Sequence, residues 1–80
     1  MSNKREASRY ASIKINTMYE RKTGYNRFDG KYFVVIDKEI NKTFGYHVLV
    51  RYLQSGQSYW LSANSIITTS VLVENESECK

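Results

Sequence analysis

The sequence contains no proline and only one cysteine, one histidine and four glycines. Without proline, the chain has no polyproline II segment, no rigid linker and no cis-proline turn. The lone Cys79 cannot form an internal disulfide, and one cysteine with one histidine cannot complete a four-ligand zinc site without carboxylates. We therefore expect an apolar core, rather than a covalent or metal cross-link, to stabilise the chain, and we expect no cofactor.

Long apolar runs are missing as well. No stretch of about 18 apolar residues occurs, so the sequence predicts no membrane-spanning helix. The opening Met-Ser-Asn-Lys-Arg-Glu is polar and lacks the apolar segment of a secretory signal. These absences predict a protein of the cytoplasm, most consistently that of a bacterial cell, with no membrane partner.

Acidic residues are scarce in the N-terminal third. The chain carries 12 lysines and arginines against 8 aspartates and glutamates, for a net charge of +4. Residues 1–31 hold eight of the basic and three of the acidic residues, a net charge of +5, whereas residues 74–80 carry a net charge of −2. This asymmetry indicates a polyanionic partner or an acidic protein surface. A soluble basic surface without a partner is the alternative that remains open.

Aromatic side chains, in contrast, are abundant, with seven tyrosines, three phenylalanines and one tryptophan in 80 residues. A chain of this length forms one domain and buries only about 60% of its unfolded surface. Each aromatic side chain can bury roughly 150–250 Å². We therefore expect the aromatic residues to supply much of the core.

The clearest pattern is a β-hairpin over residues 44–60. Ser55-Gly56 predicts its turn, because glycine reaches a positive φ without a Cβ clash. Residues 57–61 are expected to form the return strand. In the first strand, period-two alternation places one set of side chains on a common face: Tyr46, Val48, Val50 and Tyr52.

Three further strands are expected. Residues 31–38 form a continuous apolar run rich in β-branched and aromatic types, which favours a central strand, and a polar connector follows over 39–43. Residues 67–74 are expected to form the last strand. The strict alternation of Ala11 to Ile15 predicts a short strand over residues 10–15.

Helical structure is expected only in short pieces. Thr17 and Glu20 have the spacing of a capping box, which predicts one or two helical turns over residues 17–23, with an irregular loop as the alternative. Small and cap-forming residues over 62–66 predict a brief 3₁₀ turn. Residues 1–9 are interpreted as a flexible arm or the first turns of a helix.

Together these elements predict a mainly β protein with five short antiparallel strands, bent into a small barrel. Antiparallel connections are expected because no interval is long enough for a parallel crossover, and closure limits exposed strand edges. The barrel domain is expected to span residues 10–74. It would be preceded by the arm of residues 1–9 and followed by an acidic, disordered tail over residues 75–80.

One pattern over residues 25–74 is carried by Gly30 to Asp37, Gly45, Val48 to Tyr52, Gly56, Trp60 and Ala63 to Ile66. This pattern resembles the small SH3-like (Tudor-like) barrels of bacterial and phage proteins, including the barrel that precedes some phage homing-type nuclease domains. The resemblance implies an SH3-like barrel that contacts nucleic acid or another protein through loops at one end. The chain lacks the cluster of acidic residues before a tryptophan that SH3 domains use for proline-rich peptides.

Cations and aromatic rings alternate within twelve residues of the N-terminal half, which is a pattern typical of nucleic-acid binding, because cations neutralise phosphates and flat rings stack on bases. In the alternative interpretation, Phe28, Tyr32 and Trp60 are core residues and the cations are merely solvated. The candidate binding residues in this stretch are Arg21, Lys22, Tyr25, Arg27, Phe28 and Lys31. Tyr46, Arg51 and Tyr59 would join them if the fold brings them to the same surface.

No catalytic pattern is present. His47 has Asp37 and Glu39 as its nearest candidate partners, but these are interpreted as charges flanking a strand. Neither a Gly-x-Ser-x-Gly elbow nor a Gly-rich phosphate loop occurs. The sequence therefore predicts a non-enzymatic binding module.

Two hypotheses about the partner follow from these patterns. In the first, the basic and aromatic surface binds DNA or RNA. In the second, the chain is a phage-encoded inhibitor that binds an acidic surface of a host protein, such as a defence nuclease, without binding nucleic acid itself. A variant of the second is pairing through an exposed strand edge, with a partner strand or as a homodimer.

Overall fold

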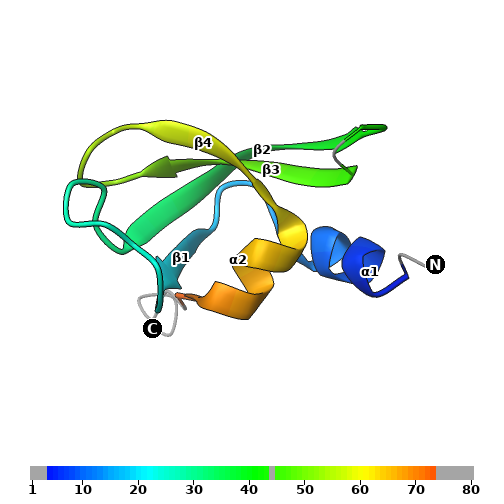
Figure 1. Cartoon of the computed structure of the whole chain (residues 1–80), viewed down its shortest axis with the longest axis horizontal. Coiled ribbons are helices and arrows are strands. Elements are labelled where there is room, and N and C mark those ends of the chain that lie inside the picture. Colours follow the sequence, from blue (N-terminus) through cyan, green and yellow to red (C-terminus); the bar gives the residue numbers. More distant parts are fainter. Residues whose placement is uncertain (1–3, 44, 74–80) are drawn as a thin grey trace, which may run out of the picture.

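A single sheet of five antiparallel strands organises the computed structural model, which describes residues 4–43 and 45–73 (Figure 1). The order across the sheet is β4-β3-β2-β1-β5, so β4 and β5 form its two edges. These pairings confirm the mainly β class with five antiparallel strands, and they leave the sheet open between the two edges. The strands are β1 (Met18–Arg21), β2 (Tyr32–Asn41), β3 (Gly45–Tyr52), β4 (Ser58–Ser62) and β5 (Ser70–Leu72).

Strand β3 follows the alternation expected from the sequence, and it forms the first strand of the expected hairpin over residues 44–60. Val48 and Val50 are fully buried and Tyr52 nearly so, which confirms the face assigned to β3. We call this side the inner face and the opposite side the outer face. The return strand β4 also forms as expected, after a turn in which Gly56 has a φ of +78°.

A β-bulge interrupts β2 between Val35 and Asp37. Val35 pairs with Val50, but the next paired residue is Asp37, so Ile36 is inserted into the ladder. Because strand side chains alternate, one inserted residue transfers every later side chain to the opposite face. The bulge therefore places Asp37 and Glu39 on the outer face.

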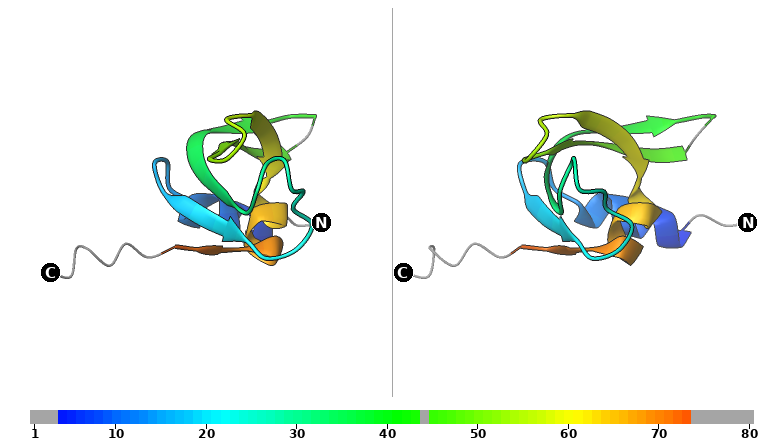
Figure 2. Two further views of the ribbon diagram at one scale, coloured as in Figure 1. Left: turned by 90° about the vertical axis from the view of Figure 1, so that its left-hand side faces the viewer. Right: turned by 60° about the vertical axis from the view of Figure 1, so that its left-hand side comes forward.

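Two helices lie together on one side of the sheet, α1 (Lys4–Ser12) and α2 (Ala63–Thr69) (Figures 1 and 2). Glu6 in the first turn of α1 and Arg9 in its last turn have the charges that the helix dipole favours. Ser62 caps α2, since its hydroxyl accepts a hydrogen bond from the Ser65 N–H at 3.0 Å. No helix in the described part of the chain is long and apolar enough to cross a membrane.

The core lies between the inner face and the two helices. Helix α2 contributes Ala63 and Ile66, and the segment after α1 contributes Ile13. The ring centroids of Tyr19 and Phe33 lie 5.8 Å apart, within the usual range for packed aromatic pairs. The buried apolar residues are Ile13, Tyr19, Phe33, Val35, Val48, Val50, Tyr52, Ala63 and Ile66.

Two expectations for the N-terminal third are wrong. Residues 10–15 are not a strand, because α1 continues to Ser12 and only Ile13 enters the core. Residues 17–23 are neither a helix nor an irregular loop, since Met18–Arg21 forms β1 between β2 and β5. Thr17 does not cap a helix, and its hydroxyl donates to the carbonyl oxygen of Lys14 at 2.6 Å.

The C-terminal third differs from expectation in where its helix ends. The residues expected as a 3₁₀ turn begin the regular helix α2, which continues to Thr69. The last strand is therefore only the three residues Ser70–Leu72, rather than 67–74. In the N-terminal part of the chain, residues 1–9 were expected to be a flexible arm or the first turns of a helix, and residues 4–9 belong to the helix α1. The expected tail, residues 75–80, lies outside the described residues.

Candidate functional site

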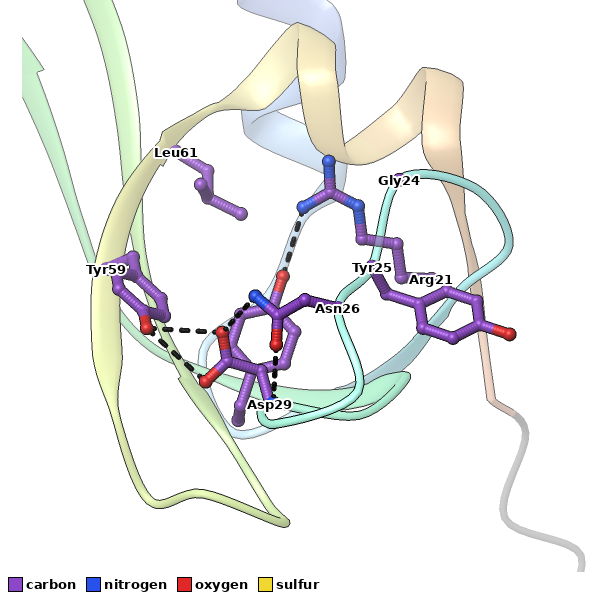
Figure 3. Close-up of a pocket in the computed structure, with 8 residues that line it drawn as sticks. Arg21, Gly24, Tyr25, Asn26, Asp29, Tyr59 and Leu61 are labelled. Carbon is purple, nitrogen blue, oxygen red and sulfur yellow. Dashed lines mark hydrogen bonds between the residues drawn. The ribbon is translucent and has the colours of Figure 1, made fainter.

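Two loops meet at one end of the sheet, and Asp29 joins them (Figure 3). The first loop, residues 22–31, connects β1 to β2, and the second, residues 53–57, connects β3 to β4. The Asp29 carboxylate is buried and accepts hydrogen bonds from the Ser55 hydroxyl at 2.6 Å and the Tyr59 hydroxyl at 3.2 Å. One carboxylate thus holds the first loop against the second loop and against β4.

A second link joins the same two loops through backbone oxygens. The side-chain amide of Gln54 donates to the carbonyl oxygens of Arg27, at 2.5 Å, and Phe28, at 3.0 Å. Gly30 has a φ of +82°, and a Cβ at this position would lie 3.0 Å from Gln54 Oε1. Glycine is therefore required here both for the backbone conformation and for the close approach of Gln54.

Within the first loop, Asn26 positions Asp29 for these contacts. The side-chain oxygen of Asn26 accepts a hydrogen bond from the Asp29 N–H at 2.7 Å, and its amide nitrogen donates to the Asp29 carboxylate at 3.0 Å. Hydrogen bonds from Ser55 first, and from Asn26 and Tyr59 after it, hold the pKa of Asp29 below its usual value, although burial opposes them. Asp29 is therefore a carboxylate at neutral pH.

The pKa of Tyr59 is raised, whereas that of Asp29 is lowered. Burial raises the pKa of its phenol, and the hydrogen bond and negative charge of Asp29 raise that pKa further. The phenol accordingly remains a hydrogen-bond donor to Asp29 up to alkaline pH. Figure 3 shows the two side chains pointing toward one another, Tyr59 from β4 and Asp29 from the loop.

Between β4 and the first loop lies a shallow pocket of about 270 Å³. Arg21 borders it from β1, with Nε donating to the carbonyl oxygen of Thr23 at 2.9 Å and Nη1 donating to the Tyr52 hydroxyl at 3.0 Å. Arg21 and Asp29 bring opposite charges to the pocket, so its own net charge is close to zero. The pocket is lined by Arg21, Gly24, Tyr25, Asn26, Asp29, Tyr52, Tyr59 and Leu61.

Most of the residues expected to bind are brought together at this end of the molecule. Arg21, Tyr25 and Tyr59 line the pocket, and the ring of Tyr25 points outward from it (Figure 3). The ammonium nitrogen of Lys31 lies 5.9 Å from the centre of the Tyr25 ring. We define the loop surface as Arg21, Tyr25, Arg27, Phe28, Lys31 and Tyr59.

Of the other expected binding residues, Tyr46 and Arg51 lie apart from the loop surface, and Lys22 contributes less charge to it. Tyr46 packs beside α1, with its ring centre 5.2 Å from that of Tyr10. Arg51 is exposed on the outer face of β3, where Val34 and Ser58 are its cross-strand neighbours. Lys22 forms an ion pair with Glu20 at 3.3 Å, which partly neutralises its charge.

The alternative in which three aromatic residues are core is wrong. The exposed fraction is 66% for Phe28, 41% for Tyr32 and 43% for Trp60. Phe28 lies on the first loop, whereas Tyr32 and Trp60 point to the outer face of the sheet. Of the three, only Phe28 belongs to the loop surface.

Sequence reasoning missed the residues that hold the loop surface in place. None of Asn26, Asp29, Gln54 and Ser55 is among the candidate binding residues, although their side chains join the two loops. The available signal was an asparagine three residues before Asp29-Gly30, since a capping asparagine accepts a hydrogen bond from a backbone N–H two or three residues on. Their partners in the second loop have no comparable local signal.

The loop surface contains no histidine and no cysteine. The described residues include no group of three or more His, Cys, Asp and Glu side chains that could hold a metal ion. His47 lies on the outer face, where its ring centre is 6.1 Å from that of Trp60. No protein-family model matches the chain, and comparisons with curated proteins and with solved structures found no match either.

Proposed function

We propose that this chain is a non-enzymatic binding module that binds single-stranded nucleic acid at the loop surface. The observation that carries the proposal is the exposure of three aromatic side chains on adjoining segments, namely Phe28 at 66%, Tyr25 at 44% and Tyr59 at 40%. An exposed aromatic side chain is costly in water, and three at one end of a small domain are a platform for flat partners.

Base stacking fits this platform. Every nucleobase has a π-face, and stacking on an aromatic side chain contributes about 1–3 kcal/mol per base. Tyr25 points outward (Figure 3), and Phe28 is exposed on a loop whose backbone accepts hydrogen bonds from Gln54. Paired bases in a duplex are not free to stack in this way, so the single strand is the preferred form.

The cations around the platform are few and partly paired. Arg27 and Lys31 are exposed beside the aromatic side chains, and the Lys31 ammonium lies 3.7 Å from Glu20, which it shares with Lys22. Few cations therefore remain to neutralise phosphates, and affinity should depend less steeply on salt than in a strongly basic protein. We expect stacking to contribute more than ion pairing.

Fluorescence anisotropy with labelled single-stranded and double-stranded DNA and RNA, at two salt concentrations, tests the proposal. Phe28→Ala and Tyr25→Ala should each weaken single-strand binding about fivefold or more, as expected for one lost stack. Tyr32→Ala is the matched control, because Tyr32 has the same exposure as Tyr25 but lies on the outer face. Equal loss in Tyr32→Ala, or no binding at low salt, would reject the proposal.

A second candidate is a protein-directed role, such as a phage-encoded inhibitor of a host enzyme. It is favoured by the pairing of the cations, since Arg21 is engaged by Tyr52 and Lys22 and Lys31 share Glu20. Tyrosine and arginine are also the residue types that dominate protein interfaces. A resemblance to SH3-like barrels fits either partner. Capture of one host protein, abolished by Phe28→Ala, by a chain that binds no oligonucleotide would select this role.

A further inference from the structure

The outer face carries a second hollow, at the other end of the β2–β3 hairpin from the loop surface. It has a volume of about 290 Å³ and is lined by Glu39, Asn41, His47 and Trp60. Three strands contribute to it, since Glu39 and Asn41 lie on β2, His47 on β3 and Trp60 on β4. None of these residues belongs to the loop surface, so the hollow is a separate feature.

The β-bulge at Ile36 builds this hollow. It places Glu39 on the outer face in register with His47 and Ser62, and Asp37 in register with Leu49 and Trp60. If Ile36 were instead paired in a regular ladder, Asp37 and Glu39 would point to the inner face, where Val35 is buried. Bulges that redirect side chains in this way are common beside binding sites.

The same bulge separates the charges of β2. Lys38, between the two acids, points to the inner side, where its ammonium lies 4.3 Å from the centre of the Tyr10 ring. Burial raises the pKa of Tyr10, and the charges of Asp37 and Glu39 raise it further, so their negative potential reaches across the sheet. The outer face is thus locally acidic in a chain whose net charge is +4.

Trp60 supplies an aromatic wall beside these carboxylates. Its side chain is 43% exposed, on an edge strand, and its ring is tilted by 36° relative to that of His47. An indole face attracts cations more strongly than any other side-chain ring. An exposed indole next to an exposed carboxylate is suited to a flat cation that stacks on one and donates hydrogen bonds to the other.

We propose that this hollow binds the guanidinium group of an arginine side chain presented by a protein partner. The guanidinium plane stacks on Trp60, while two of its N–H groups donate to the Glu39 carboxylate. Asp37, one register step away, adds attraction without a direct contact. A lysine ammonium is a poorer fit, because it is a strongly hydrated point charge that neither stacks nor donates in a bidentate fork.

The tryptophan itself makes the test direct. Trp60 is the only tryptophan in the chain, so fluorescence excited beyond tyrosine absorption reports on this hollow alone. The ligands are a capped Gly-Arg-Gly tripeptide and its citrulline and lysine analogues. Citrulline has the size and planarity of arginine without its charge. We expect the arginine peptide to change Trp60 fluorescence with a Kd on the order of millimolar, as suits one partly exposed contact.

The analogues and variants decide the outcome. We expect the lysine peptide to bind at least about threefold more weakly than the arginine peptide, and the citrulline peptide not to bind. Glu39→Gln should reduce the affinity for the arginine peptide about fivefold or more. Glu20→Gln is the matched control, since it removes a carboxylate from the far side of the same face. Equal binding of citrulline, unchanged affinity in Glu39→Gln, or no response to arginine up to about 50 mM, well above the expected Kd, would overturn the proposal.

This test is independent of nucleic-acid binding. Phe28→Ala removes the most exposed aromatic side chain of the loop surface and leaves the hollow intact, so the arginine peptide should still bind to that variant. Loss of arginine binding in Phe28→Ala would contradict the separation of the two sites.

Discussion

At the scale of single residues, the described structure depends unusually on one carboxylate. Asp29 receives hydrogen bonds from three side chains that belong to the first loop, the second loop and β4. A neutral amide of the same shape cannot replace it, because the amide's own N–H groups would face donors. Asp29 therefore determines the relative position of the two loops and also places a negative charge between them.

The lowered pKa of Asp29 has a consequence for stability that can be measured. Because the folded pKa lies below the ordinary value of 3.8, the stabilisation is present above that value and is lost as pH falls toward the folded pKa. We expect the stability of the wild type to urea to fall as pH drops below the ordinary aspartate pKa of 3.8 toward the lower pKa of the folded state. Asp29→Asn should be less stable at neutral pH and should lack this contribution to the acid slope.

The control for that experiment is Asp37→Asn, which removes an exposed carboxylate that joins no loops. If wild type, Asp29→Asn and Asp37→Asn all lose stability equally as pH falls, the role of Asp29 is contradicted. The comparison separates a specific effect from the general effect of lowering the number of carboxylates.

At the scale of elements, the two loops behave as one unit because their side chains interlock. Gly30 and Gly56 provide a matched pair to test this, since both have a positive φ, of +82° and +78°. A Cβ on Gly56 would meet nothing within 4 Å, whereas one on Gly30 would meet Gln54 at 3.0 Å. An alanine at either position therefore has a similar backbone cost, but only an alanine at Gly30 also meets Gln54.

We expect Gly56→Ala to lower the free energy of unfolding by about 1–2 kcal/mol, which is the cost of a left-handed Cβ. Gly30→Ala should cost more, because Gln54 must also move away from the first loop. Urea denaturation measures both values. A smaller loss in Gly30→Ala than in Gly56→Ala would show that Gln54 moves without cost and that the loops are not interlocked.

The elements also show how far the sequence could predict this structure. The alternation of Val48, Val50 and Tyr52 sufficed for β3, because one face of that strand is buried along its length. The strand β1 could not be predicted, since its four residues become a strand by pairing with β2 and β5, which are distant in sequence. A local sequence pattern predicts structure that forms between residues close in sequence, and the four residues of β1 have almost no such pattern.

The candidate site divides in the same way. Exposed side chains such as Tyr25 and Phe28 could be selected from composition, because cations and aromatic rings are contiguous in that part of the chain. The exposure of Trp60 could not be predicted, because it follows from the face to which β4 turns that residue. The Ile36 bulge, which determines where Glu39 points, also has no signature in the sequence.

At the scale of the whole molecule, one small core joins the sheet to both helices. Ile66 is 1% exposed and places α2 in that core, whereas Ile40, on β2, is 65% exposed. The two isoleucines allow the contribution of the core to be separated from that of residue type.

Ile66→Ala should reduce the free energy of unfolding by about 2–5 kcal/mol, because it removes a buried side chain and leaves a cavity. Ile40→Ala should change it by less than about 0.5 kcal/mol. If Ile66→Ala does not fold, Ile66→Val, with an expected cost of about 0.5–1.5 kcal/mol, gives the measurement by urea denaturation. Similar losses in Ile66→Ala and Ile40→Ala would place the core elsewhere.

The pairing of Tyr19 with Leu72 has a consequence for how the protein is made. Strand β1 is translated before every other described strand, but its neighbour β5 is the last of the described strands. Until residue 72 has emerged, one edge of β1 has no partner and the nascent sheet remains incomplete. Such distant pairing slows folding relative to a helical protein of equal length. The sheet therefore cannot be complete until the last of its described strands has been translated.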